Sequence, residues 1–495
     1  MDFTGTILWL LALLPVSLAA LALVMPSARS AIAAVAWGVP PIAAAAAFAV
    51  VKVFRSGPLL SAGGWLHLDA LSAYHMIVMM AVFVLGSVYA AAYFRREPEE
   101  HVLSRNQARR FAALWCGALG AMTVVLLSNN LALMWVGVEA TTLLTAFLIC
   151  MRISPVSLEA TWKYLVVCSV GVAFAFMGVL LVAASVGQPS ADPHLLHWTR
   201  MREIAGTLDS RLLKMAFIFL VVGYGTKAGL APMHSWLPDA HSQAPAPVSA
   251  VFSGFMLNMA LYCIMRYVPL VEAATGGSAW TSGILVGFGL VSIVIAAVFI
   301  LAQHDLKRLF AYCSVEHIGI IALGLGLGPA GAFAALFHTL NHSVCKVLGF
   351  FSAGRLGQIY GTHDMRGIRA GLKTSPLWGT ALFASMLALI GVAPFAIFMS
   401  ELLILKAAVE SGRYAAMAVF LLGSATVFVG VLRQAMDMAW GGNAEAARAP
   451  ERPSVSEWMV VVLPLLLLLV LGLWMPPAFR RILQDAAAVL TGGGS

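Results

Sequence analysis

The sequence predicts an all-α polytopic membrane protein, and three observations support this class. Of the 495 residues, 61% are hydrophobic and only 11% are charged, whereas an ordinary soluble domain has about 25% charged residues. Apolar runs of about 20 residues, the length that crosses a bilayer as a helix, follow one another along the chain. Two of these runs contain similar proline motifs, GLAP and GVAP, which predict helices that are broken inside the membrane.

By length, the apolar runs predict about fourteen transmembrane helices. The second run contains Pro40 and Pro41 and is rich in alanine, so it carries the weakest helical signal. The first run follows MDFTGT, which has no basic residue, and we therefore expect a retained helix rather than a secretory signal. The expected spans are 6–25, 31–53, 69–94, 111–128, 130–151, 161–185, 212–240, 245–266, 281–302, 307–327, 330–351, 376–409, 414–438 and 456–475.

One membrane domain accounts for the whole chain, because the polar stretches between spans are short enough to be loops. GLAP begins at Gly229 and GVAP begins at Gly391, each in the fourth helix of a five-helix half. Broken helices at corresponding places of two halves are typical of transporters built from inverted repeats; two ordinary proline kinks are the alternative. The expected division is N-terminal helices at 1–94, a first repeat at 111–266, a second repeat at 281–438 and a C-terminal helix at 456–475, within the single domain 1–495.

The formal net charge of +8 does not indicate a nucleic-acid partner, because the basic residues are spread over short loops. Loops after the odd-numbered spans hold roughly 17 Lys and Arg, and the other loops hold roughly 10. Since the richer side faces the cytoplasm in most membrane proteins, we expect a multi-pass protein of the bacterial inner membrane with both termini in the periplasm.

The cysteines predict no cofactor. The six cysteines never form a CxxC pair, so they are not spaced to ligate an iron–sulfur cluster or to attach haem. No glycine-rich phosphate loop stands between a strand and a helix. We therefore expect no metal, no cofactor and no catalytic residue in this chain, and we assign any redox chemistry to another subunit.

Ionisable residues inside the predicted spans mark the candidate site, because a charge at the centre of a membrane helix costs roughly 2.5–3.5 kcal/mol. Glu139 stands in the middle of its span, and Lys227 stands just before the GLAP break. A buried carboxylate and a buried ammonium hold each other in the charged state when they pair. We expect such a pair here, and a small helix motion that separated it would release a proton.

The second half carries a row of similar groups. FHTLNHSVCK places His338, His342 and Lys346 at i, i+4 and i+8, on one helical face, and Glu401 follows the GVAP break. A lone buried histidine is usually a satisfied core residue, but a histidine pair with a lysine favours a functional role. The predicted proton pathway comprises Glu139, Lys227, His338, His342, Lys346 and Glu401, with His234, Asp239, His241, Asn258, Glu316 and His317 as accessory residues.

Other charges near span ends have a simpler interpretation. Asp239 and His241 either cap a helix or line a water-filled entrance. The cations at span ends, which we expect to reach the membrane interface with their long side chains, are Lys163, Lys307, Arg308 and Arg413.

Specific motifs add a family resemblance. The run KAGLAPMHSWLPDAHSQAPAPVSAVFSG, together with HDLKRLFAYCSVEHIG and the embedded Glu139, resembles the antiporter-like proton-translocating subunits of respiratory complex I, Mrp-type cation/proton antiporters and group 4 hydrogenases. The resemblance covers nearly the whole chain. SVEHIG and LNMALYCIMRY are most similar to the component F family of hydrogenase-4 and formate hydrogenlyase complexes.

This resemblance implies a fourteen-helix fold with two inverted five-helix repeats, and it implies roles for the candidate residues. Glu139 matches the glutamate of the fifth helix, and Lys227 matches the lysine before the break of the seventh. His338, His342 and Lys346 match the residues of the eleventh helix, and Glu401 matches the terminal group of the twelfth. Complex I subunits usually have a lysine in the middle of the eighth helix, where this chain has Asn258. Asparagine does not titrate, so a proton passing here needs water or a histidine.

The resemblance therefore implies a proton-translocating membrane subunit of a multi-subunit, hydrogenase-4-like energy-converting oxidoreductase. Its expected partners are the lipid bilayer, other membrane subunits and peripheral redox subunits that carry iron–sulfur clusters and a nickel–iron hydrogenase. The alternative is a module of an Mrp-type cation/proton antiporter or of an inorganic-carbon uptake complex. A purely structural membrane anchor is disfavoured by the cost of so many intramembrane charges.

Overall fold

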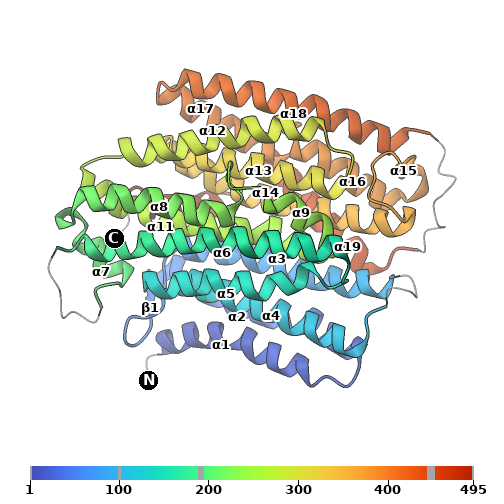
Figure 1. The fold of residues 1–495 in the computed structure, drawn as a ribbon, viewed down its shortest axis with the longest axis horizontal. Coiled ribbons are helices and arrows are strands. Elements are labelled where there is room, and N and C mark those ends of the chain that lie inside the picture. The colour runs from blue at the N-terminus through green and yellow to red at the C-terminus, as the bar shows by residue number, and fades with distance from the viewer. Residues whose placement is uncertain (1–2, 98–101, 188–193, 443–451, 493–495) are drawn as a thin grey trace.

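The long helices lie side by side and stack from α1 at one edge of the bundle to α18 at the other (Figure 1). The computed structural model describes residues 3–97, 102–187, 194–442 and 452–492. Among these residues, 11 helices are long and apolar enough to cross a membrane. The chain is therefore a multi-pass, mostly helical membrane protein, which agrees with the predicted class.

The first half of the chain contains short elements that the sequence did not predict. β1 and β2 form a two-stranded antiparallel hairpin before α3, and α7 lies within a stretch expected to be a loop. The elements are α1 (Phe3–Leu23), α2 (Ala28–Ser56), β1 (Leu59–Leu60), β2 (His67–Leu68), α3 (Ala70–Arg95), α4 (Arg105–Leu127), α5 (Leu131–Ile149), α6 (Pro155–Ala184), α7 (Trp198–Glu203), the 3₁₀ turn η2 (Ala205–Thr207), α8 (Ser210–Ala228) and α9 (Trp236–Gln243).

In the second half, two helices end later than expected and two are additional. α11 continues to Thr275 and α14 to Tyr360, beyond the predicted ends at 266 and 351, and α15 and α20 were not predicted. The elements are α10 (Ala246–Val251), the π-helical turn η3 (Phe252–Met256), α11 (Leu257–Thr275), α12 (Ala279–Leu301), α13 (Leu306–Leu325), α14 (Gly328–Tyr360), α15 (Gly371–Thr374), α16 (Pro376–Leu389), α17 (Ala396–Glu410), α18 (Tyr414–Trp440), α19 (Val455–Leu473) and α20 (Pro477–Leu490).

The predicted spans at 212–240 and 376–409 are each divided into two helices, α8 with α9 and α16 with α17. After the first helix of each pair, a glycine adopts a left-handed conformation, with φ 81° at Gly229 and 70° at Gly391. The next residue then donates its N–H to the carbonyl five residues back, over 2.8 Å from Leu230 and 3.1 Å from Val392. Glycine adopts this conformation without a steric penalty. The two breaks therefore share one local structure. By contrast, Pro40 and Pro41 leave α2 continuous.

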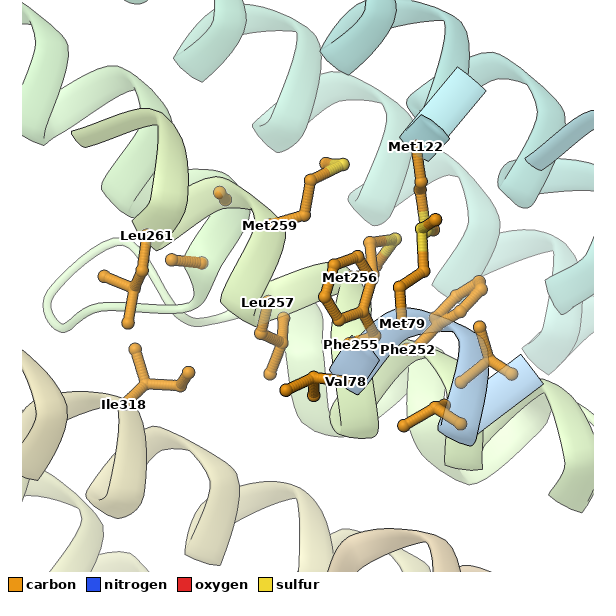
Figure 2. Close-up of a cluster of buried hydrophobic side chains, with 14 of the residues drawn as sticks. Val78, Met79, Met122, Phe252, Phe255, Met256, Leu257, Met259, Leu261 and Ile318 are labelled. Atoms are coloured by element: carbon orange, nitrogen blue, oxygen red, sulfur yellow. The ribbon is translucent and has the colours of Figure 1, made fainter. Parts of the chain in front are cut away.

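The centre of the bundle is filled by large apolar side chains around the π-helical turn η3. Figure 2 shows Met79 of α3 and Met122 of α4 meeting Phe252 and Met256 of η3, and Ile318 of α13 beside Leu261 of α11. These side chains are almost fully buried. Because a π turn adds a residue to the helical repeat, it changes the face that the following helix presents, and α11 with Asn258 begins directly after it.

A buried ion pair ties the start of α3 to α11. Two nitrogens of Arg266 donate to the two carboxylate oxygens of Asp69, over 2.5 and 2.8 Å. The guanidinium also lies against the rings of Trp198 and Tyr262. Burial alone would raise the pKa of the Asp69 carboxyl, but the charge of Arg266 outweighs it and holds this pKa well below its usual value.

We expect Asp69→Asn to destabilise the fold strongly, because it leaves the Arg266 guanidinium buried without a counter-charge. Breaking a buried pair in this way costs about 3–5 kcal/mol. The measurement is thermal unfolding of the full chain in detergent. Asp364→Asn is the matched control, since Asp364 pairs with Arg366 where their side chains are 41% and 69% exposed, and such a pair contributes about 0–1 kcal/mol. Equal melting of the two variants would contradict this prediction.

Candidate functional site

Lys227 lies in the last turn of α8, directly before the first helix break, and is fully buried. Its ammonium nitrogen donates to Thr142 Oγ1 of α5, over 3.0 Å, and to the Tyr164 hydroxyl of α6. The same nitrogen lies 4.7 Å from the centre of the Tyr164 ring. Hydroxyl groups from two helices therefore hold this lysine at the end of a third.

Glu139 does not contact Lys227 directly, contrary to the predicted pair. One carboxylate oxygen accepts a hydrogen bond from Ser169 Oγ over 3.3 Å, and the other is buried without a partner among the described residues. The two charges still interact electrostatically. Since Thr142 follows Glu139 by three residues, both lie on the same face of α5, and the threonine takes the position beside the ammonium.

Three imidazole rings form a connected group in the second half. His338 of α14 lies with its Nε2 2.8 Å from Nδ1 of His317 on α13, and its own Nδ1 lies 2.9 Å from Ser400 Oγ on α17. The His317 ring also lies against His342, with centroids 5.3 Å apart. All three histidines are buried. Because an imidazole can accept a proton at one nitrogen and donate from the other, this group can pass a proton between three helices.

Glu401 follows Ser400 on α17 and lies against the second helix break. A Cβ atom added at Gly391 would come within 2.3 Å of Glu401 Oε2, so the glycine leaves room for the carboxylate. Ligand atoms of Glu401, His317 and His338 lie within 4.8 Å of one another, and donors of these types also bind zinc. Both ring nitrogens of His338 lie within hydrogen-bond distance of His317 or Ser400, whereas Nε2 of His317 has no partner among the described residues.

His338, His342 and Lys346 all face α13. Both histidines lie against His317, and the Lys346 ammonium donates to the backbone carbonyl of Phe310 over 2.7 Å. Neither ring nitrogen of His342 has a partner among the described residues.

Glu316, the neighbour of His317 on α13, is also buried. Its carboxylate interacts electrostatically with both Glu401 and Lys346. The second half therefore carries two acidic groups beside its basic row.

The middle section of the predicted route consists of Asn258 on α11 and His241 on α9. Asn258 donates from Nδ2 to Gly254 O over 3.0 Å and to Ser343 Oγ over 2.9 Å, and its Oδ1 has no partner among the described residues. His241 stacks on Phe350, and neither of its nitrogens has a partner in the described part of the chain. This middle section therefore offers one histidine and one amide.

Asp239, a predicted accessory residue on α9, has structural partners. Asp239 forms ion pairs with Lys163 over 3.1 Å and with Arg308 over 2.6 Å, and all three side chains are partly exposed. This cluster joins α6, α9 and α13 and does not contact the imidazole group. His234 is buried, with Nδ1 unpartnered among the described residues.

Lys307 is a buried cation that the sequence interpretation missed. Its residue exposure is 3%, and its ammonium donates to the carbonyls of Ser242 and Ala244, over 2.8 and 2.5 Å, at the C-terminal end of α9. The expectation that it reaches the membrane interface was wrong, because the end of α9 covers it. The sequence contained a pattern that could have predicted this burial. Adjacent residues of a helix point about 100° apart, so Lys307 and Arg308 do not share one exposed face.

Two broken helices and a buried series of lysine, histidine and glutamate side chains define a membrane protein of the ion-transporting class. A family model described as NADH:quinone oxidoreductase/Mrp antiporter, transmembrane, matches residues 128–427, and the chain belongs to this family.

Individual proteins show the same relationship. The chain is 34% identical over 432 residues to a "Hydrogenase-4 component F homolog" of Methylacidiphilum infernorum (isolate V4), which covers 86% of this chain and 89% of that protein. A chain of the membrane-bound sulfane sulfur reductase, an archaeal respiratory membrane complex, is 25% identical with a TM-score of 0.86, covering 98% of this chain and 97% of that one. A chain of the Mrp complex from Dietzia sp. DQ12-45-1b shares the fold, with 21% identity, a TM-score of 0.86 and coverage of 99% and 98%.

Proposed function

We propose that this chain is a proton-translocating membrane subunit of a multi-subunit, hydrogenase-4-like energy-converting oxidoreductase. The observation that carries the proposal is the buried chain of hydrogen bonds from His317 through His338 to Ser400, beside Glu401 at a helix break. Similarity to a hydrogenase-4 component F homolog supports the oxidoreductase context.

We further propose an architecture of two inverted five-helix repeats, at 111–266 and 281–438, within a single domain. Counting α14 and the two broken helices as crossings adds three to the 11 spans and brings the total to about fourteen. In Figure 1, α8 leads from the end of the bundle that holds α7 toward the opposite end, whereas α16 begins beside α15 and leads back. The opposite directions and the shared hydrogen-bond pattern of the two breaks support an inverted relationship.

In the first half, Lys227 is proposed to hold the transferred proton. Thr142 and Tyr164 hold its ammonium, and Glu139 lies within electrostatic reach. A small movement of the α8 end relative to α5 and α6 would take the ammonium away from these oxygens. Because a buried ammonium without partners is less stable in its charged form, the proton would then leave.

In the second half, the proposed route runs from Lys346 through His342, His317 and His338 to Ser400 and Glu401. Each imidazole takes up a proton at one nitrogen and releases one from the other. Glu401 delivers the proton at the second helix break.

The middle of the route is proposed to include water. Buried polar atoms in proteins almost always have a protein or water partner, and buried water typically bridges such groups. The unpartnered atoms of His241, Asn258 and His342 are of this kind. Water between them would connect Lys227 to Lys346 without a lysine at position 258.

The remaining assignments follow from topology. The start of α1 and the end of α20 lie at the same end of the bundle (Figure 1), and the distribution of basic loops supports periplasmic termini in a bacterial inner membrane. We assign no cofactor to this chain. Other membrane subunits and peripheral subunits with iron–sulfur clusters and a nickel–iron hydrogenase supply the driving reaction.

The test is proton translocation by the complete complex in vesicles that contain a pH-sensitive dye. We expect Glu401→Gln to lower translocation, but by less than about 100-fold, the lower range for a positioned proton-transfer group, because the amide does not titrate and water can replace only part of its role. Glu410→Gln is the matched control, since Glu410 lies on the same helix and is 53% exposed. Equal translocation by both variants and the wild type would contradict the role of Glu401.

The shared fold with the Mrp complex chain favours one second candidate, a module of a cation/proton antiporter. A sodium gradient would then drive proton movement in the vesicles without an electron donor. An inorganic-carbon uptake complex would instead purify with a cytoplasmic zinc protein. Proton movement that requires the electron donor and copurifying iron–sulfur subunits supports the oxidoreductase.

A further inference from the structure

A groove of about 630 Å³ opens between α2, α3 and α4, away from the proposed proton route. These helices lie toward the edge of the bundle that holds α1 (Figure 1). Alanines on all three helices, including Ala36, Ala91 and Ala108, leave the space open, and Trp37 and Phe94 provide apolar walls. The volume lies within the range of about 300–1,000 Å³ that is usual for ligand sites.

The mouth of the groove is cationic. Arg29 at the start of α2 and Arg95 at the end of α3 both line it, and both residues are exposed. No hydrogen bond or ion pair joins either guanidinium to another described residue, and no acidic residue is among the described lining. Nearby, Arg109 of α4 donates to the carbonyl of Met25 over 2.6 Å, which ties the α1–α2 turn to α4 beside this mouth.

The depth of the groove matches one leaflet of a bilayer. Its lining on α2 runs from Ala28 to Trp37, a rise of about 14 Å at 1.5 Å per residue. The hydrocarbon core of a bilayer is about 30 Å thick, so the groove extends through roughly half of it. Trp37, at the deep end, is 80% exposed.

We propose that this groove binds an anionic phospholipid of the leaflet at the α2 N-terminal end. The acyl chain lies along the alanine-lined wall, and the phosphate accepts hydrogen bonds from Arg29 and Arg95. Guanidinium groups match phosphate oxygens in geometry as well as in charge. The phosphate of a zwitterionic headgroup is accompanied by its own cation, so two guanidinium groups at the mouth favour a lipid with a net negative charge.

The test is native mass spectrometry of the full-length chain in detergent, mixed with phosphatidylglycerol or with phosphatidylcholine of the same acyl chains. We expect one phosphatidylglycerol to be retained preferentially, and the double variant R29Q/R95Q to lower its affinity on the order of tenfold or more. The matched control is R55Q/R110Q, which loses the same charge at two exposed arginines that do not line the groove.

A groove-filling variant, A36F/A91L, gives a second measurement that does not depend on charge. It should lower retention of phosphatidylglycerol while leaving the melting temperature near that of the wild type. Equal retention of the two lipids, equal loss in R29Q/R95Q and the control, or full retention in A36F/A91L would each overturn the proposal.

Discussion

Replacing Lys227 with methionine should lower proton translocation by the reconstituted complex at least about 100-fold, the lower range for a positioned proton-transfer group. Methionine is close to lysine in length, but it carries no proton. The fold should tolerate the change, because the Tyr164 hydroxyl keeps its hydrogen bond with Thr145 Oγ1, at 2.6 Å. The measurement is the initial rate of dye response in vesicles, normalised to the amount of assembled complex.

Two further variants separate proton transfer from simple loss of a charge. Lys227→Arg keeps the positive charge, but a guanidinium does not release its proton in proteins, so we expect it to lose translocation as well. Lys406→Met removes a lysine whose side chain is 68% exposed and lies 3.7 Å from Glu410, and it should translocate at the wild-type rate. Wild-type translocation by Lys227→Met would remove Lys227 from the route.

Replacing His338 with phenylalanine should have a similar effect, a loss of at least about 100-fold. His338 is the residue that connects His317 on α13 to Ser400 on α17. Phenylalanine fills a similar volume but ends the hydrogen-bonded chain, because its ring has neither a donor nor an acceptor.

The matched control for this histidine is His304→Phe, at an exposed position just before α13. A third variant, His338→Gln, keeps hydrogen-bonding groups without titrating, and we expect it to remain as inactive as His338→Phe. Recovery of translocation in His338→Gln would show that hydrogen bonding alone, rather than proton uptake by the imidazole, is what this position requires.

The helical architecture followed from the sequence to a large extent. The continuous apolar runs predicted the long helices, and GLAP and GVAP predicted the two breaks at Gly229 and Gly391. The hairpin of β1 and β2 and the helix α20 were missed. The hairpin strands are two residues each, too short for an alternating pattern, and α20 is shorter than a membrane span.

The arrangement of the site was less predictable. His317 was only an accessory candidate, yet it contacts both His338 and His342. Lys307 was expected at the interface and is buried under the end of α9. Glu139 was expected to pair with Lys227, but Thr142 and Tyr164 take that place.

The sequence by itself determined which segments lie in the membrane and which of them carry charges, because the cost of transferring a side chain into hydrocarbon depends mainly on that side chain. Only the tertiary structure decided which groups meet. Hydrogen bonds such as those of Lys227 and His338 join helices far apart in the chain, and they depend on the rotation and depth of each helix. Those quantities come from packing against neighbouring helices, which no single segment specifies.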